Sequence, residues 1–211
     1  LALMRELPGM TVLSPADGPE AGRAIRAALA DLSPVTRLTS GKSHVENVTF
    51  ARRYLRTDGT FSGIQGSDGS DAPLSHHETE ADTELRALRF YRDGKKDVVL
   101  TNFQVHAATA LSTSNNLCAD FITAVRDDVE AKEDVLVMYL QGGCGNSNTY
   151  SKIDPDAPGD DYLLAGHRIA EGVLRGLGNL EEIESGKIFL SRGSYEATVN
   201  HSKTHMAPLA L

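Results

Sequence analysis

Two apolar runs joined by a helical pattern place the tightest constraint on what this chain can fold into. Residues 98–103 read Val-Val-Leu-Thr-Asn-Phe, and residues 135–140 read Val-Leu-Val-Met-Tyr-Leu. Both have the length and β-branched content of strands, and their apolar residues are successive rather than alternating, which is typical of strands buried on both faces. Between the two runs, apolar residues recur at helical spacing: Phe121, Ile122, Val125 and Val129. Two such strands connected by a helix favour a parallel, right-handed βαβ unit.

The parallel arrangement predicts where the chemistry of the chain would lie. His106 comes three residues after the first strand, and the glycine-rich segment Gln-Gly-Gly-Cys-Gly-Asn, residues 141–146, follows the second. Parallel strands end at the same edge of a sheet, and open α/β sheets bind ligands at that edge. We therefore expect His106 to lie close to the glycine-rich loop, and we take their meeting point as the functional centre.

Further helices and strands are predicted around this unit. Amphipathic helices are expected over residues 20–32 and 163–177. A strand over residues 85–91 is expected to form a hairpin with the first apolar run through the turn sequence Asp-Gly-Lys at residues 93–95. Another strand is expected over residues 186–194.

These elements predict a single α/β domain over residues 1–211, incomplete at both ends. Its core would be a mixed β-sheet with a central parallel βαβ unit flanked by helices. Residues 57–81 form a long polar loop within the domain, which is either a functional lid or a mobile insertion.

Composition narrows the classes of partner. The formal net charge of −8 over 211 residues disfavours nucleic acid and anionic membranes as the main partner. No apolar run approaches the roughly 18 residues that indicate a transmembrane helix. Two cysteines, Cys118 and Cys144, are too few for a disulfide scaffold, and the sequence leaves open whether they pair. The chain starts at Leu1 and shows no signal peptide, so we expect a piece of a longer protein and derive neither a compartment nor an oligomeric state from it.

His106 is the strongest single candidate for chemistry. It follows a strand end and precedes small residues, Ala-Ala-Thr-Ala, that leave room for a ligand. A histidine in this position is suited to binding a metal or to acting as a general base. The alternative is a histidine whose hydrogen bonds are satisfied at the strand end.

The loop over residues 141–146 has two readings. Its glycines, Gly142, Gly143 and Gly145, would let backbone N–H groups approach an anion or an oxyanion. Alternatively, they serve a tight turn that needs positive φ. The loop lacks the Lys-Ser/Thr ending of a phosphate-binding loop. Cys144 could be a nucleophile, but no activating base is identified for it.

Other polar residues carry weaker signals. Arg52 and Arg53 are suited to clamping a polar or anionic substrate group, or they are solvent-exposed or ion-paired. Asp120, at the start of the central helix, is explained by the helix dipole alone. The adjacent His76 and His77 are interpreted as solvated, because metal ligands usually need spaced side chains.

Several short motifs follow one another in a fixed order along the chain. They are Ala-Arg-Arg at 51–53, Asp-x-x-Leu-x-x-Leu-x-Phe at 82–90, Asn-Phe-x-x-His at 102–106, Cys-Ala-Asp-Phe at 118–121 and Gln-Gly-x-x-Gly-Asn at 141–146. In this order and spacing the chain, from about residue 18 to residue 178, resembles the amino-terminal catalytic domain of the neutral/alkaline (non-lysosomal) ceramidases and their bacterial relatives.

The resemblance implies a zinc-dependent amide hydrolase acting on a small-molecule or lipid amide. It implies that His106 is a zinc ligand and that Arg52 contacts the substrate or the transition state. Gln141, Gly142, Gly143 and Asn146 would line the substrate site. Zinc would polarise the scissile carbonyl and lower the pKa of a bound water towards about 7.

The chain also departs from the family's motifs. Ala51 replaces an asparagine, Gly142 replaces the serine of true ceramidases, and no segment matches the Thr-His-x-His motif that supplies the first zinc histidine. These differences motivate an alternative function, a non-catalytic binding module that keeps the fold and has lost the metal site.

Overall fold

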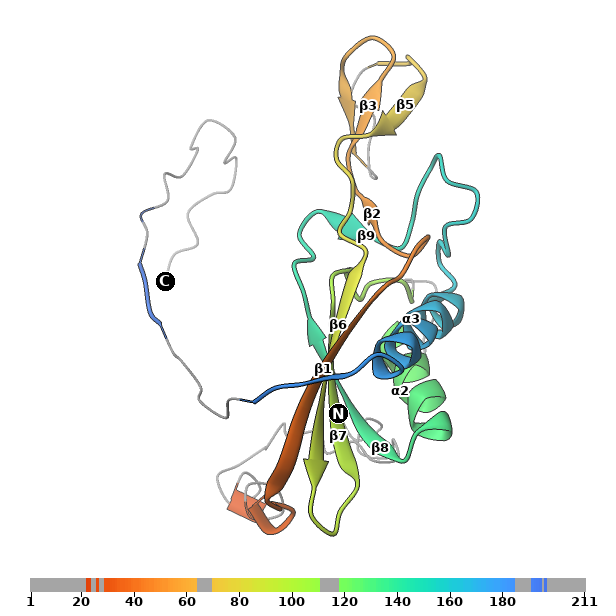
Figure 1. Ribbon diagram of the computed structural model, residues 1–211. Coiled ribbons are helices and arrows are strands. Elements are labelled where there is room, and N and C mark those ends of the chain that lie inside the picture. Colours follow the sequence, from red (N-terminus) through yellow and green to blue (C-terminus); the bar gives the residue numbers. More distant parts are fainter. Residues whose placement is uncertain are drawn as a thin grey trace.

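A five-stranded sheet with helices α2 and α3 on one face forms the centre of the molecule (Figure 1). The computed structural model describes residues 22–23, 26, 29–63, 70–110, 118–184, 191–194 and 196. Two smaller sheets lie beyond the end at which the central parallel strands finish (Figure 1). The predicted α/β class is therefore confirmed.

The central sheet is mixed, as predicted. Its strand order is β10-β1-β6-β7-β8. The strands are β1 (Val35–His44), β6 (Glu84–Arg92), β7 (Asp97–Phe103), β8 (Val135–Gln141) and β10 (Glu181–Glu182). β1, β6 and β7 are antiparallel neighbours, whereas β7 and β8 are parallel.

The predicted βαβ unit is present. α2 (Phe121–Lys132) follows β7 and precedes β8, and seven residue pairs join the two strands, from Asp97 opposite Val135 to Phe103 opposite Gln141. The predicted hairpin joins β6 to β7, and Gly94 takes the positive φ of 65° that its turn requires. Local sequence patterns thus determine this part of the fold.

The hydrophobic core lies between the helices and one face of the sheet. α3 (Tyr162–Leu177) matches the predicted second amphipathic helix and packs on α2, β1 and β6. The fully buried aliphatic and aromatic side chains of this core include Leu85, Val99, Phe103, Phe121, Val125, Val129 and Ile169. Gly166 brings α3 close to α2, because a Cβ atom there would lie 2.6 Å from the Cβ of Ala124 and from the Phe121 carbonyl oxygen.

The prediction that the central strands are buried on both faces is wrong for the described part of the chain. Along β8, the buried residues Val135 and Val137 alternate with residues on the opposite face. Of these, Met138 is 56% and Leu140 is 48% exposed. The reason is that α2 and α3 cover the same face of the sheet, and no described helix covers the other face (Figure 1).

Two small sheets extend from the central one. β2 (Phe50–Ala51) pairs with β9 (Ser147–Asn148). β3 (Tyr54–Arg56) pairs with both β4 (Phe61–Ser62) and β5 (Leu74–His77). The predicted polar loop over residues 57–81 therefore contains β4 and β5, while its residues 64–69 lie outside the described ranges.

The ends of the chain are described in part. Residues 22–23, 26 and 29–30 are helical, in agreement with the helix predicted over residues 20–32. An amphipathic helix would bury its apolar side chains, but Leu29 is 58% and Leu32 is 70% exposed. In the strand predicted over residues 186–194, residues 186–190 lie outside the described ranges, and residues 191–194 are not in a strand.

The described residues show the state of the two cysteines and whether a helix could span a membrane. Cys118 and Cys144 are both free thiols. No helix within the described ranges is long and apolar enough to span a bilayer.

The contact between α2 and α3 gives a test of the fold. Gly166→Ala should lower the free energy of unfolding by about 1–3 kcal/mol, because the added methyl group overpacks the helix interface. Gly176→Ala in the same helix is the control, since its Cβ would lie no closer than 3.8 Å to its nearest neighbour, in Lys42. The control should be neutral or gain up to about 1 kcal/mol from helix propensity. Chemical denaturation of both variants measures the difference, and a gain of stability in Gly166→Ala would contradict the packing described.

Candidate functional site

The carboxyl ends of β7 and β8 bring the predicted site segments together. Phe103 lies opposite Gln141 in the parallel register, so the residues that follow each strand leave the sheet side by side. The backbone N–H of Gly142 donates to the Phe103 carbonyl oxygen at 3.0 Å. The side-chain Nε2 of Gln141 donates to the carbonyl oxygen of Val105 at 2.8 Å, one residue before His106. The predicted closeness of the His106 segment to the glycine-rich loop is confirmed.

Close approach, rather than positive φ, explains the first glycine of the loop. A Cβ atom on Gly142 would lie 2.9 Å from the Cβ of Gln104 and 3.0 Å from the Phe103 carbonyl oxygen. Positive φ is confined, among the described glycines, to Gly59, Gly94 and Gly159. Gly142 is therefore required because the loop packs directly on the end of β7.

A second hydrogen-bond donor, from β8, holds the carbonyl oxygen of Phe103. The buried Tyr139 hydroxyl donates to it at 3.0 Å. Burial raises the pKa of Tyr139 above its ordinary value, so the hydroxyl keeps its proton and remains a donor. The strand end that carries the site is thus fixed from both β8 and its following loop.

His106 lies at the surface of this edge. Its side chain is exposed and makes no hydrogen bond to another residue that the structure describes. The segment after it is held by Asp120, the N-cap of α2, whose carboxylate accepts the N–H groups of Phe121 at 2.8 Å, Thr109 at 2.8 Å and Ala110 at 2.6 Å. Asp120 therefore anchors the loop between β7 and α2, a role that the helix dipole alone does not describe.

Arg52 reaches the site through the pairing of β2 with β9. Ala51 lies opposite Ser147, and the backbone N–H of Arg52 donates to the Asn146 carbonyl oxygen at 3.1 Å. The Arg52 side chain is half-buried. Its neighbour Arg53 is instead ion-paired with Glu78 at 3.0 Å. The fold therefore brings Arg52 to the glycine-rich loop and directs Arg53 elsewhere.

A cavity opens beside the loop. Its volume is about 420 Å³, and its lining includes Gln104, Gly143 and Asn146 on one side and Glu80 and Asp82 on the other. A second cavity of about 660 Å³ adjoins it and shares Ala51 and residues 79–81. Neither lining includes His106 or Arg52, and of the predicted site residues Gly143 and Asn146 line the cavity of about 420 Å³.

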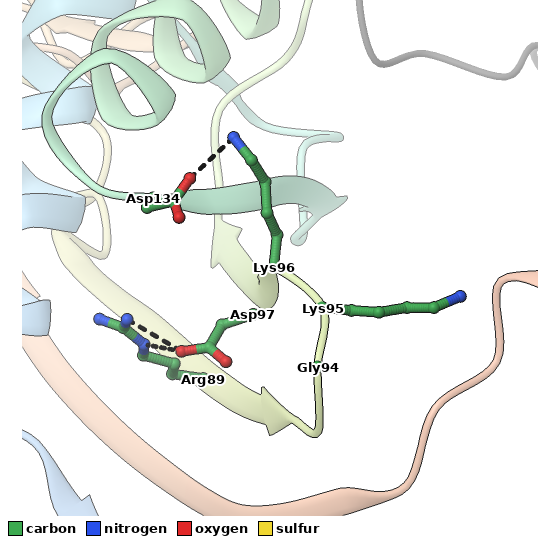
Figure 2. Close-up of a pocket in the computed structure, with 6 residues that line it drawn as sticks. All are labelled: Arg89, Gly94, Lys95, Lys96, Asp97 and Asp134. Carbon is green, nitrogen blue, oxygen red and sulfur yellow. Dashed lines mark hydrogen bonds and ion pairs between the residues drawn. The ribbon is translucent and has the colours of Figure 1, made fainter.

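A cavity at the opposite end of the strands is a poorer candidate. It measures about 450 Å³ and lies at the turn between β6 and β7 (Figure 2). Its cations are already paired: Arg89 contacts Asp97 at 2.9 Å and Lys96 contacts Asp134 at 2.8 Å. In Figure 2 the Lys95 side chain points away from the other labelled side chains, and it pairs with Asp31 at 2.8 Å. These ion pairs leave little unsatisfied charge for a ligand.

Within the described residues, no group of three or more His, Cys, Asp or Glu side chains is arranged to hold a metal ion. Cys144, the alternative nucleophile, is a half-buried free thiol in the loop.

The interpretation of His77 as a solvated histidine is wrong, and its role near the site was not predicted from the sequence. Its side chain is only 17% exposed, and its Nε2 lies 2.7 Å from the Asp154 carboxylate. Its Nδ1 donates to the Ala51 carbonyl oxygen at 2.7 Å. The ring packs against Phe50 and Tyr54, with centroid distances of 5.7 and 4.7 Å. No local pattern signals this role, because the contact joins residues that are far apart in the sequence and the histidine stands in a polar stretch.

The Asp154 carboxylate is stabilised in its charged form. Burial raises its pKa, but hydrogen bonds from Ser151 and His77 and the charge of His77 outweigh burial, so the pKa lies below its ordinary value. Asp154 is therefore ionised at neutral pH and holds the loop after β9 against β5.

Comparison with known proteins finds similarity in fold. No protein-family model matches the chain, and no curated protein matches its sequence. Among solved structures, the neutral ceramidase from Pseudomonas aeruginosa is similar with a TM-score of 0.53 and 18% sequence identity, and the match covers 76% of this chain. A ceramidase complexed with C2 is similar with a TM-score of 0.54 and 16% identity over the same share.

The match spans 25% of the length of each of these ceramidase chains. At this level of identity the likeness shows a shared fold. The solved structures therefore support the ceramidase-like fold that the short motifs indicate.

The depressed pKa of Asp154 gives a pH-dependent test. A carboxylate with a lowered folded-state pKa stabilises the fold above its unfolded pKa of about 3.9, and this contribution is lost as the pH falls through the folded-state value. Asp154→Asn should therefore be less stable than the wild type at pH 7, and the difference should shrink as the pH falls below about 4. Urea midpoints at a series of pH values measure it. A difference that stays constant from neutral to acid pH would show that the charge of Asp154 contributes nothing.

Proposed function

We propose that this chain is part of a zinc-dependent, ceramidase-like hydrolase that cleaves an amide bond. The observation that carries the proposal is the convergence at one sheet edge of His106, the glycine-rich loop and the backbone of Arg52, in a fold shared with neutral ceramidases. The substrate class follows from the names of those structures, so an N-acyl lipid amide such as ceramide is the substrate proposed.

Each predicted site residue has a role in this proposal that its position permits. His106 would be a zinc ligand, because its exposed ring is not bound by another described residue. Arg52 would contact the scissile amide, and a guanidinium suits a carbonyl oxygen that gains negative charge in the transition state. Gln141, Gly142, Gly143 and Asn146 would form the wall against which the substrate lies, with Gly143 and Asn146 facing the cavity.

The described side chains do not make up a complete zinc site. A catalytic zinc is usually held by three protein ligands, and the described ranges contain no group of three ligand-type side chains in reach of one another. His106 is accordingly proposed as one ligand of a set whose other members are not among the described residues.

A second function is favoured by specific residues. Gly142 packs so closely on Gln104 that the serine of true ceramidases could not be placed there without a shift of the loop. Ala51 replaces the asparagine of the arginine motif and is 3% exposed, so its methyl group offers no polar contact to a ligand. These two positions support a binding module that keeps the ceramidase-like fold without its metal chemistry.

Zinc binding distinguishes the two functions. Elemental analysis of the purified chain, after incubation with zinc and desalting, should find zinc in the wild type and a loss of most of it in His106→Ala, because a missing ligand weakens the site. His76→Ala is the control, since His76 is also an exposed histidine, and its ring contacts Ser75 rather than any site residue.

Each outcome decides between the proposals. Zinc that depends on His106 but not on His76 supports the hydrolase and justifies assays with an N-acyl lipid amide. Zinc that is retained in His106→Ala would contradict the assignment of this ligand. A wild-type chain that binds no zinc would favour the binding module.

A further inference from the structure

We propose that His77 is a positioning residue that sets Arg52 by holding the peptide group between Ala51 and Arg52, and that it does so as an imidazolium. That His77 affects the substrate rests on the proposed contact between Arg52 and substrate. That His77 orients the peptide group rests only on the contacts of His77.

The peptide group between Ala51 and Arg52 is held at both of its polar ends. Its carbonyl oxygen accepts a hydrogen bond from His77 Nδ1 at 2.7 Å. Its N–H donates to the Asn146 carbonyl oxygen of the glycine-rich loop at 3.1 Å. The plane of this peptide sets the backbone direction from which the Arg52 side chain leaves, so His77 and the loop together orient Arg52.

His77 is itself fixed by parts of the chain that are distant in sequence. It stands at the end of β5, its ring packs against Phe50 of β2 and Tyr54 of β3, and its Nε2 contacts the segment after β9. The backbone N–H of Lys152 in that segment donates to the Tyr54 hydroxyl at 3.0 Å. The ring therefore has little freedom to turn, and its hydrogen bond to Ala51 is pre-set.

The arrangement of acceptors requires a proton on each ring nitrogen. Nδ1 faces a carbonyl oxygen, which can only accept. Nε2 lies 2.7 Å from Asp154 Oδ2 and 3.0 Å from Ser151 Oγ, and the Ser151 hydroxyl already donates to the same carboxylate oxygen. With Asp154 ionised, both ring nitrogens act as donors, which is the imidazolium form.

The other charged groups around the ring are engaged elsewhere. On the strand of His77 and beyond its end, His76 contacts Ser75, and Glu78 pairs with Arg53. On the facing segment, the Nζ of Lys152 donates to the Gly63 carbonyl oxygen at 3.2 Å. Among the described charged side chains, Asp154 is thus the one that contacts the ring. Loss of the Nε2 proton would set a nitrogen lone pair against the Asp154 carboxylate and weaken the contact between His77 and Asp154.

Amide hydrogen exchange at Arg52 tests the proposal in the full chain. His77→Ala should raise the exchange rate of the Arg52 N–H by roughly tenfold or more relative to the wild type, after correction for global stability, because one end of its peptide is released. His76→Ala is the matched control, since it removes the neighbouring histidine without touching this peptide, and it should leave the rate unchanged.

Two conservative variants separate positioning from space filling. In His77→Asn the amide nitrogen takes the place of Nδ1 and can still donate to Ala51, whereas in His77→Gln it takes the place of Nε2 and can donate only towards Asp154. Positioning through Ala51 predicts that asparagine restores the protection of Arg52 and that glutamine does not. Equal protection in both variants, or better protection in His77→Gln, would overturn the proposal, and this comparison stands even if His77→Ala does not fold.

The pH dependence tests the charged form. In the wild type, the protection of Arg52 should fall as the pH rises and the His77 ring loses its proton, which ring ¹⁵N shifts follow in the same sample. His77→Asn should show no such change. Protection that is constant through the ring titration would overturn the imidazolium assignment. Because none of these readouts uses zinc or hydrolysis, their failure is distinct from failure of the proposed function.

Discussion

The parallel pairing of β7 with β8 is the constraint on which the rest of the structure depends. Seven residue pairs in one register make both strands finish at the same edge, so the His106 segment and the glycine-rich loop emerge together. The buried face of the pair packs under α2 and α3, which fixes the register through the core. A slip of one residue would turn the buried side chains of β8 to the other face and separate the two loops.

The site depends on contacts that are added to this edge from outside the central sheet. Arg52 is brought in by the short pairing of β2 with β9, and its peptide group is bonded on one side to the loop and on the other to His77. The contact of His77 with Asp154 then joins the outer three-stranded sheet to the segment after β9. Two features thus determine the geometry of the candidate site. One is the register of β7 with β8, and the other is the set of polar contacts that His77 makes with Ala51 and Asp154.

Features governed by local patterns could be predicted from the sequence, and features governed by long-range packing could not. The alternation of apolar runs with a helical period predicts the βαβ unit and the closeness of the His106 segment to the glycine-rich loop. The role of His77 was not predictable, because its partner Asp154 is remote in sequence. Gly142 is required because the loop packs closely on Gln104, and Met138 is exposed because the helices cover the other face of the sheet. Both features depend on which surfaces pack together, which a local sequence pattern does not predict.

We propose that the sheet edge that unites His106, the glycine-rich loop and Arg52 binds a metal ion. The most direct measurement is a titration of the ¹⁵N-labelled chain with Co²⁺, a paramagnetic substitute for zinc, followed by the loss of amide signals and compared with the same titration of His106→Ala. The account predicts that signals of Gly142, Gly143, Asn146 and Arg52 are lost first, and only when His106 is present. Signal loss centred elsewhere, or unchanged in His106→Ala, would contradict it.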